Sequence, residues 1–160
     1  MFAKVIKEMI DFFGNDTRRI VHSLKVFSYT QTIAELEGID EEQREIAIVV
    51  AILHDIGIKI AEEKYGSCTA KQQEEEGPIV AENILKQLNF SNKFIERVKY
   101  IIAHHHHPSE SEDMDFRLII EADYLVNLEE GDIPLKHLDN IIDKHFRTKT
   151  GKDIALTMFK

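Results

Sequence analysis

The most apolar part of the chain is Ile46–Leu53, where eight consecutive residues carry no polar side chain. Asp40 precedes it, with a Gln three positions later, which is typical of a helix N-terminus. A helix without a polar face must be covered by other elements on all sides. We therefore predict a central helix that delivers His54 and Asp55 to the protein interior, with Gly57 ending the helix.

Apolar residues recur every three to four positions in several other segments, and this spacing predicts further helices. We expect them over residues 2–13, 17 to about 37, from Pro78, from Ser91, over 115 to about 128, from Pro134, and after Gly151. Between them, Glu62–Gly77 lacks the spacing and predicts a long surface loop.

No segment alternates apolar and polar residues with the period of two that a strand requires. We therefore predict an all-α fold, a single helical domain over residues 1–160 with about six to eight helices. The candidate motifs lie in a core of about residues 18–128, and residues 129–160 form a C-terminal helical extension.

The composition excludes several classes of protein. A formal net charge of −9 gives no general attraction to nucleic acids or anionic membranes, so we expect neither as a partner. The single cysteine, Cys68, excludes an internal disulfide framework and a cysteine-rich zinc site. No stretch reaches the ~18–20 apolar residues of a membrane span, and the N-terminus lacks the apolar core of a signal peptide. We expect a soluble, cytoplasmic protein.

Four side chains with metal-binding chemistry lie in predicted helices that are largely apolar: His22, His54, Asp55 and Asp123. A buried charge must be paired or hold a metal, because an isolated one is very costly. Two imidazoles and two carboxylates suit a divalent ion such as manganese, iron, cobalt, nickel or zinc. The alternative is a core histidine that hydrogen-bonds its neighbour, since the spacing does not show that the four residues meet.

The ordered set of His22, the His54-Asp55 pair and Asp123 resembles the H…HD…D signature of the HD-domain superfamily of metal-dependent phosphohydrolases. The resemblance covers roughly residues 18–127 and includes the segments Leu53–Gly57, Ile101–His105 and Glu121–Asp123. It implies that His22, His54, Asp55 and Asp123 bind one divalent metal inside a helical bundle. The metal would activate a water that attacks a phosphate ester.

The resemblance also implies that His104 and His105 face the site as metal ligands, whereas we expect His106 and His107 on the solvent side. Branches of the superfamily with two metals usually carry a histidine where this chain has Gln73. The resemblance therefore leaves a second metal open.

Other side chains are candidates for catalysis or for a second metal. Arg18 shares a helix face with His22, and Lys59 lies four residues after Asp55, so both are candidate phosphate clamps. Asp55, or a nearby acid or histidine, would orient or deprotonate the attacking water. Glu74, or one of its neighbours Glu75 and Glu76, could supply a general acid or a ligand. The alternative for each of these charges is a solvated surface position.

Departures from the superfamily patterns narrow the substrate. Pro108-Ser109-Glu110 replaces the Gly-Tyr-Pro of cyclic-dinucleotide phosphodiesterases, and Ile58 replaces an acid of nucleoside-monophosphate hydrolases. We expect a phosphomonoesterase or phosphodiesterase for a small phosphomonoester or nucleotide-like substrate, as a monomer or homodimer. Two alternatives remain, namely a metal- or nucleotide-binding sensor without turnover, and a domain that uses metal only for stability.

Overall fold

The computed structural model of the protein describes residues 1–160 and consists of nine α-helices, one short 3₁₀-helix and no strand. The predicted all-α fold is confirmed, with one α-helix more than the upper end of our expectation. The helices are α1 Phe2–Phe13, α2 Thr17–Leu36, α3 Glu41–Leu53, α4 Gly57–Tyr65, α5 Ala70–Gln87, α6 Asn92–His104, α7 Met114–Glu129, η1 Leu135–His137, α8 Leu138–His145 and α9 Lys149–Phe159.

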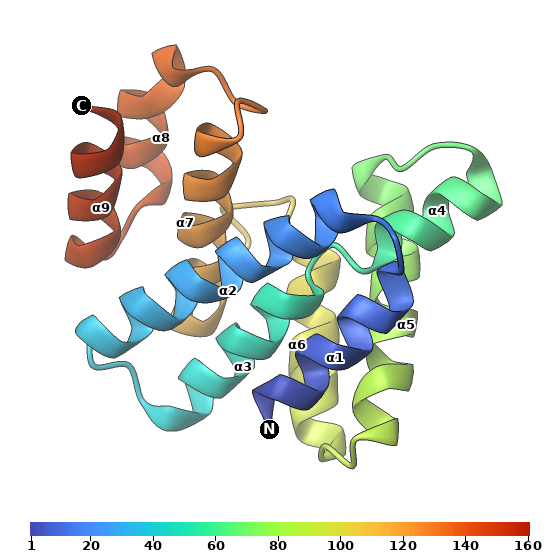
Figure 1. Ribbon diagram of the computed structural model, residues 1–160. Helices are drawn as coiled ribbons and strands as arrows, with labels where there is room; N and C mark the ends of the chain where they lie inside the picture. Colours follow the sequence, from blue (N-terminus) through green and yellow to red (C-terminus); the bar gives the residue numbers. More distant parts are fainter.

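Helix α3 lies in the middle of the fold, between α4 and α5 on one side and α7 to α9 on the other (Figure 1). It packs against α1, α2, α6 and α7. No residue of Ile46–Leu53 is more than 6% exposed, which confirms the predicted central helix. Asp40 caps its N-terminus by accepting a hydrogen bond from the backbone N–H of Gln43. The helix ends at Leu53, and Gly57 begins α4 instead of ending α3.

The loop predicted over residues 62–77 is wrong, because most of this segment is helical. It contains the end of α4 and the first part of α5, and Pro78 lies inside α5 instead of beginning a helix. Thr69 and Gln72 form a capping box that starts α5. The exposed polar residues of this segment hide the apolar spacing, and packing against the rest of the fold stabilises the helix.

Helices α4 and α5 cross at two glycines that come unusually close together. A Cβ atom at Gly57 would lie 2.6 Å from the backbone nitrogen of Gly77, and one at Gly77 would lie 2.9 Å from Cγ2 of Ile102. Only glycine allows this approach, which brings α5 into direct contact with α4 at Gly57 and with α6 at Ile102. The crossing lies two residues after Asp55 and thus fixes the backbone close to that carboxylate.

The C-terminal helices are anchored to α7 by two buried charged side chains. The carboxylate of Glu121 accepts hydrogen bonds from the backbone of Arg147 and from the backbone and hydroxyl of Thr148. Arg117 donates to the carbonyl oxygens of Pro108 and His145. These bonds join α7 to the segment before α9 and to the loop after the histidine run. The boundaries here also differ from our prediction, since α8 begins at Leu138 and α9 at Lys149.

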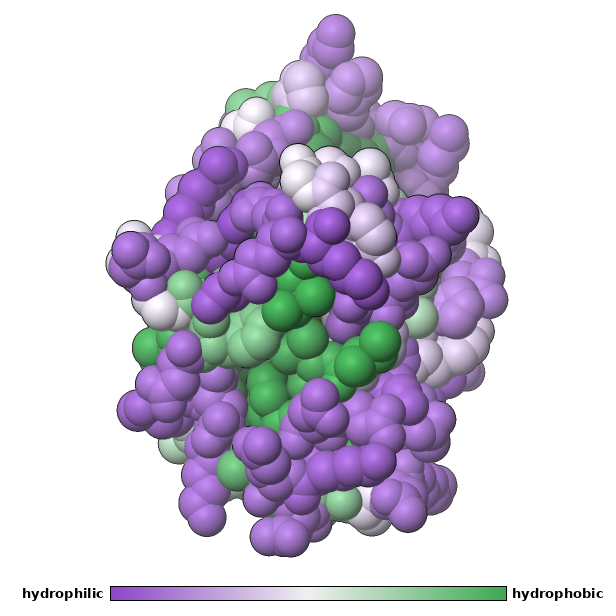
Figure 2. All heavy atoms as spheres, turned by 90° about the vertical axis from the view of Figure 1, so that its right-hand side faces the viewer, coloured by the Kyte–Doolittle hydropathy of each residue, from purple (hydrophilic) through white to green (hydrophobic).

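The surface is mostly hydrophilic, in line with a charged content of 31%. On the side where α4 and α5 lie, apolar side chains gather in the middle of the face and are framed by hydrophilic ones (Figure 2). None of the helices combines the length and the apolarity that crossing a membrane would require.

The glycine crossing leads to a test of stability. Replacing Gly with Ala inside a helix normally stabilises a protein by up to ~1 kcal/mol. Gly57→Ala should instead lower the free energy of unfolding by about 1–3 kcal/mol, because the new methyl group meets the backbone of Gly77. Urea denaturation measures the change.

Glu63→Ala, at an exposed position of the same helix, should change stability by less than about 0.5 kcal/mol. Equal or increased stability of Gly57→Ala would contradict the crossing.

Candidate metal centre

The structure brings together the side chains of His22, His54, Asp55 and Asp123, which come from α2, the end of α3 and α7. The Nε2 atoms of His22 and His54 are 3.2 Å apart. Oδ1 of Asp123 lies 3.2 Å and 3.4 Å from these two nitrogens, respectively. Oδ2 of Asp55 lies 3.4 Å from Nε2 of His22 and 3.3 Å from Nε2 of His54. Four potential ligand atoms therefore meet in one small volume.

The hydrogen bonds of the histidine rings determine which nitrogen faces this volume. Nδ1 of His54 donates to the carbonyl oxygen of Ala51 at 2.8 Å, and Nδ1 of His105 donates to that of Ile102 at 2.7 Å. A carbonyl can only accept, so the proton of each neutral ring is on Nδ1 and the lone pair is on Nε2. The lone pairs of His54 and His105 are thus available to a cation.

A second group of potential ligands consists of Asp55, His105 and His106, whose ligand atoms lie within 4.8 Å of one another. Oδ1 of Asp55 is 3.6 Å from Nε2 of His105, while its Oδ2 faces the first group. One carboxylate is therefore shared between the two groups. The predicted solvent position of His106 is wrong, because its ring is half-buried beside Asp55 and its Nε2 donates to Gln73 at 3.2 Å.

Two buried polar atoms support a cation at these groups. Oδ1 of Asp123 and Nε2 of His105 are shielded from solvent and make no hydrogen bond of regular geometry. Their nearest polar neighbours are members of the cluster itself, Nε2 of His22 at 3.2 Å and Oδ1 of Asp55 at 3.6 Å, respectively. A buried polar atom without a partner costs about 1–3 kcal/mol, so native proteins rarely leave one. Imidazole nitrogens and carboxylate oxygens are ligands that divalent transition metals prefer. The side chains present here thus fit a divalent metal.

Without an ion, the cluster holds its charges by mutual pairing. Burial alone would lower the pKa of His54, but the neighbouring carboxylates of Asp55 and Asp123 outweigh it and raise that pKa well above its ordinary value. Burial likewise opposes ionisation of both aspartates, yet the facing histidines lower the pKa of each carboxyl. Burial and the neighbouring His105 lower the pKa of His106 to about 4, so that ring is neutral at pH 7.

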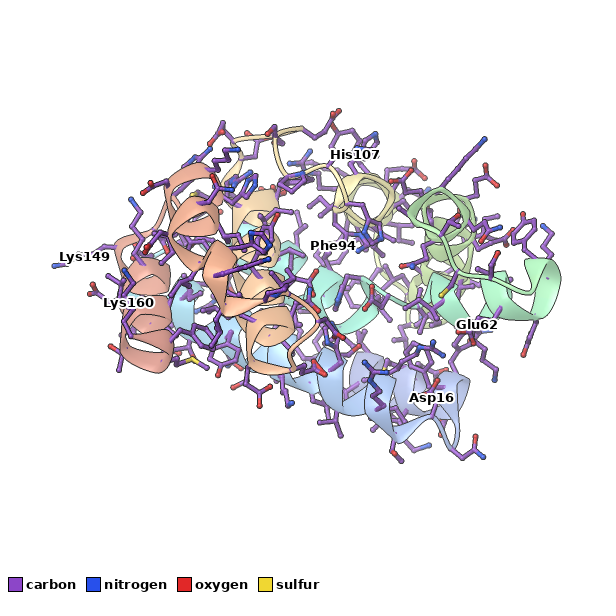
Figure 3. All side chains as sticks on the ribbon, turned by 90° about the horizontal axis from the view of Figure 1, so that it is seen from above. Asp16, Glu62, Phe94, His107, Lys149 and Lys160 are labelled. Carbon is purple, nitrogen blue, oxygen red and sulfur yellow. The ribbon has the colours of Figure 1, made fainter.

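The first group opens onto a cleft of about 360 Å³. The cleft is almost entirely polar and is lined by Asp16, Arg18, Arg19, His22, Asp55, Ile58, Glu130 and Asp132. Arg18 is a weakly held cation here, since its side chain is 77% exposed and its only ion pair, with Asp132, is 3.4 Å long. Arg19 is held between Asp16 and Glu62, at 2.7 Å and 2.6 Å. Figure 3 shows these two carboxylates side by side at one end of the molecule.

A second, smaller cavity of about 170 Å³ shares no lining residue with this cleft. Its lining includes His105, His106, Asp123, Tyr124 and Asn127. Candidate ligands thus line both cavities, of which only the larger contains arginines.

Three predicted site residues are not brought to the cluster. Lys59 donates to the carbonyl oxygen of Phe12 at 2.7 Å, because the break between α3 and α4 turns it away from Asp55. His104 donates to the carbonyl oxygen of Tyr100 at 2.7 Å and stacks on the Tyr100 ring. Glu74 pairs with His107 at 2.8 Å. Their positions do not support the roles of clamp, ligand and acid that we predicted for them.

Three other residues at the site are absent from the motif: Arg19, His106 and Glu130. Oε1 of Glu130 lies 2.6 Å from Nδ1 of His22. A signal for it was available, since Glu130 lies seven residues after Asp123 and thus on the same face of α7. No comparable signal distinguishes Arg19 from its neighbour Arg18, or His106 from the rest of the histidine run.

Comparisons with known proteins agree with this fold. The HD domain family model matches residues 19–144, a range that contains both ligand groups. The crystal structure of a predicted HD superfamily hydrolase from an uncultured Thermotogales bacterium is similar to this structure, with a TM-score of 0.68. The two share 22% sequence identity over 97% of this chain and 83% of that chain. No curated protein matches the chain by sequence.

The paired charges make metal affinity dependent on pH. Their carboxylate neighbours raise the pKa of His22 and His54, so these rings hold protons at a pH where free histidine is neutral. A metal must displace those protons. Affinity for zinc or cobalt should therefore fall as the pH is lowered from about 8 to about 6, by about tenfold per pH unit for each proton displaced.

Calorimetric titration in two buffers of different ionisation enthalpy measures both the affinity and the protons released. His137→Gln, at an exposed position outside the cluster, should behave as the unmodified protein. A pH-independent affinity would contradict the pairing of histidines with carboxylates.

Proposed function

This chain belongs to the HD-domain family, and we propose that it is a metal-dependent phosphohydrolase acting on a small phosphomonoester or nucleotide. The observation that carries the proposal is the convergence of His22, His54, Asp55 and Asp123 beside a cleft that contains two arginines. The name of the structural neighbour, an HD superfamily hydrolase, supports the reaction class.

The proposed metal ligands follow from the two groups of side chains. His22, His54, Asp55 and Asp123 would hold one divalent ion, and Asp55 with His105 and His106 would hold a second. When bound, such an ion polarises a phosphoryl oxygen and lowers the pKa of the water that attacks it. Manganese, iron, cobalt, nickel and zinc all suit this set of ligands.

The protein side chains of the cleft would bind and orient the substrate. Arg18 is free to move onto a phosphate group, because its pair with Asp132 is long and exposed. Arg19 is fixed between Asp16 and Glu62, whose two carboxylates offset its charge, so Arg18 is the principal cation that a phosphate would meet. The acidic side chains around them disfavour a substrate with many phosphates, which supports a small phosphomonoester or a nucleotide with few phosphates.

One observation favours the alternative of a sensor that binds without turnover. Gln73 holds His106 through its side-chain oxygen and donates to the carbonyl oxygen of Cys68. An amide is a weaker metal ligand than the histidine that two-metal members of the family carry at this place. A protein with a weak second site could bind a phosphorylated ligand and leave it intact.

One experiment separates the candidates. The protein is loaded with each of the five metals and assayed against p-nitrophenyl phosphate, bis-p-nitrophenyl phosphate and a panel of nucleotides. Metal-dependent turnover that is lost in a His54→Ala, Asp55→Ala variant supports the phosphohydrolase. Tight nucleotide binding without turnover supports the sensor. Unfolding on addition of a chelator, without either activity, would instead indicate a purely structural metal.

The two candidate phosphate clamps make a matched pair. Arg18→Ala should lower kcat/KM by about tenfold or more, mainly through KM, because a charge-assisted hydrogen bond is worth about 1.5–3 kcal/mol. Lys59→Ala should leave kcat/KM nearly unchanged, since its amine is bound to Phe12. Steady-state kinetics with the best substrate of the panel measures both. The reverse ranking would contradict the assignment of the cleft as the phosphate site.

A further inference from the structure

The histidines of the cluster differ in what holds their Nδ1 atoms. His54 and His105 both donate to the carbonyl oxygen three residues earlier in their own helix. His22 instead donates to the carboxylate of Glu130, at the C-terminal end of α7, at 2.6 Å. Both side chains are largely buried, with exposed fractions of 11% for His22 and 14% for Glu130.

The position of each histidine in its helix explains this difference. His54 and His105 are the C-caps of α3 and α6, where the last carbonyl groups have no partner within the helix. His22 lies in the second turn of α2, where the neighbouring carbonyls are already used by the helix itself. Its ring therefore has to find an acceptor on another helix.

We propose that Glu130 is a positioning residue that holds the proton of His22 on Nδ1 and so directs the Nε2 lone pair into the cluster. This inference rests on the proposed metal site. Without the carboxylate, a neutral His22 ring could carry its proton on Nε2, which is 3.2 Å from both His54 and Asp123. A ring in that tautomer cannot bind a metal through Nε2.

Helix α7 would then have two functions at the site. Asp123 is the candidate ligand, and Glu130, two turns further on, orients a ligand that belongs to α2. A carboxylate behind a ligating histidine also makes the ring a stronger donor, and removing such a group typically costs about 10- to 100-fold in metal affinity. The motif contains His22 and Asp123 but not Glu130, so this contribution is separate from the motif itself.

The neighbouring residue provides a matched control. Glu129 is on the same helix end and pairs with Lys25 at 3.0 Å, with its side chain 45% exposed. Glu130→Ala should weaken zinc or cobalt binding by about 10- to 100-fold in competition with a chelator of known affinity. Glu129→Ala should change it by less than about twofold.

A second measurement needs no metal. Long-range ¹H–¹⁵N NMR spectra at alkaline pH, where the ring is neutral, report which nitrogen of His22 is protonated, with the signal assigned by a His22→Gln variant. The unmodified protein should have the proton on Nδ1. In Glu130→Gln the side-chain amide can donate to Nδ1, and the proton should move to Nε2 in a substantial fraction of molecules.

The outcomes separate this inference from the proposed function. A protein that binds no metal refutes the proposed function, while the NMR spectra still decide the role of Glu130. A proton on Nε2 of His22 in the unmodified protein would overturn the inference. Unchanged affinity of a folded Glu130→Ala variant in a metal-binding protein would overturn it too. If thermal denaturation shows that Glu130→Ala does not fold, Glu130→Gln carries the affinity measurement as well.

Discussion

Helix α3 is apolar on every side over residues 46–53, and this requires other helices to surround it. His54 and Asp55 directly follow the last residue of the helix, so the burial that stabilises the core also places an imidazole and a carboxylate among α2, α6 and α7. Charged groups in such a place are stable only if they neutralise one another or hold a cation. The composition of the site is therefore a consequence of where the central helix ends.

A second constraint is the close crossing of α4 and α5 at Gly57 and Gly77. Gly57 follows Asp55 by two residues, and Gly77 meets Ile102, whose carbonyl oxygen holds the ring of His105. Two close contacts, one between glycine backbones and one with the side chain of Ile102, thus connect the segment after the shared carboxylate with the segment that carries His105. Side chains larger than hydrogen at these glycines would separate the helices and with them the two groups.

Helix α7 connects the site to the rest of the fold through both of its sides. Toward the cluster it presents Asp123 and Glu130, and elsewhere it presents Arg117 and Glu121, which bind the backbone of the C-terminal segment. Burial raises the pKa of Glu121, and the three hydrogen bonds that it accepts compensate for part of this effect. Residues 129–160 thereby hold the helix that carries the candidate ligand, although they contain none of the motif.

Much of the fold and of the site could be predicted from the sequence, because both depend on strong local signals. An apolar run of eight residues requires a buried helix, and the ordered histidines and aspartates indicate their family.

The direction of side chains at helix ends could not be predicted. His104, His105 and His106 are neighbours in sequence, yet His104 faces Tyr100, whereas His105 and His106 face Asp55. Successive residues of a helix are rotated by about 100°, so an error of one residue in the helix end changes the direction of every side chain there. Lys59 was misplaced for the same reason, since α3 and α4 are separate helices. The helices over residues 57–87 and the contact between His22 and Glu130 depend on atoms far apart in the chain, so only the packing of the complete fold decides them.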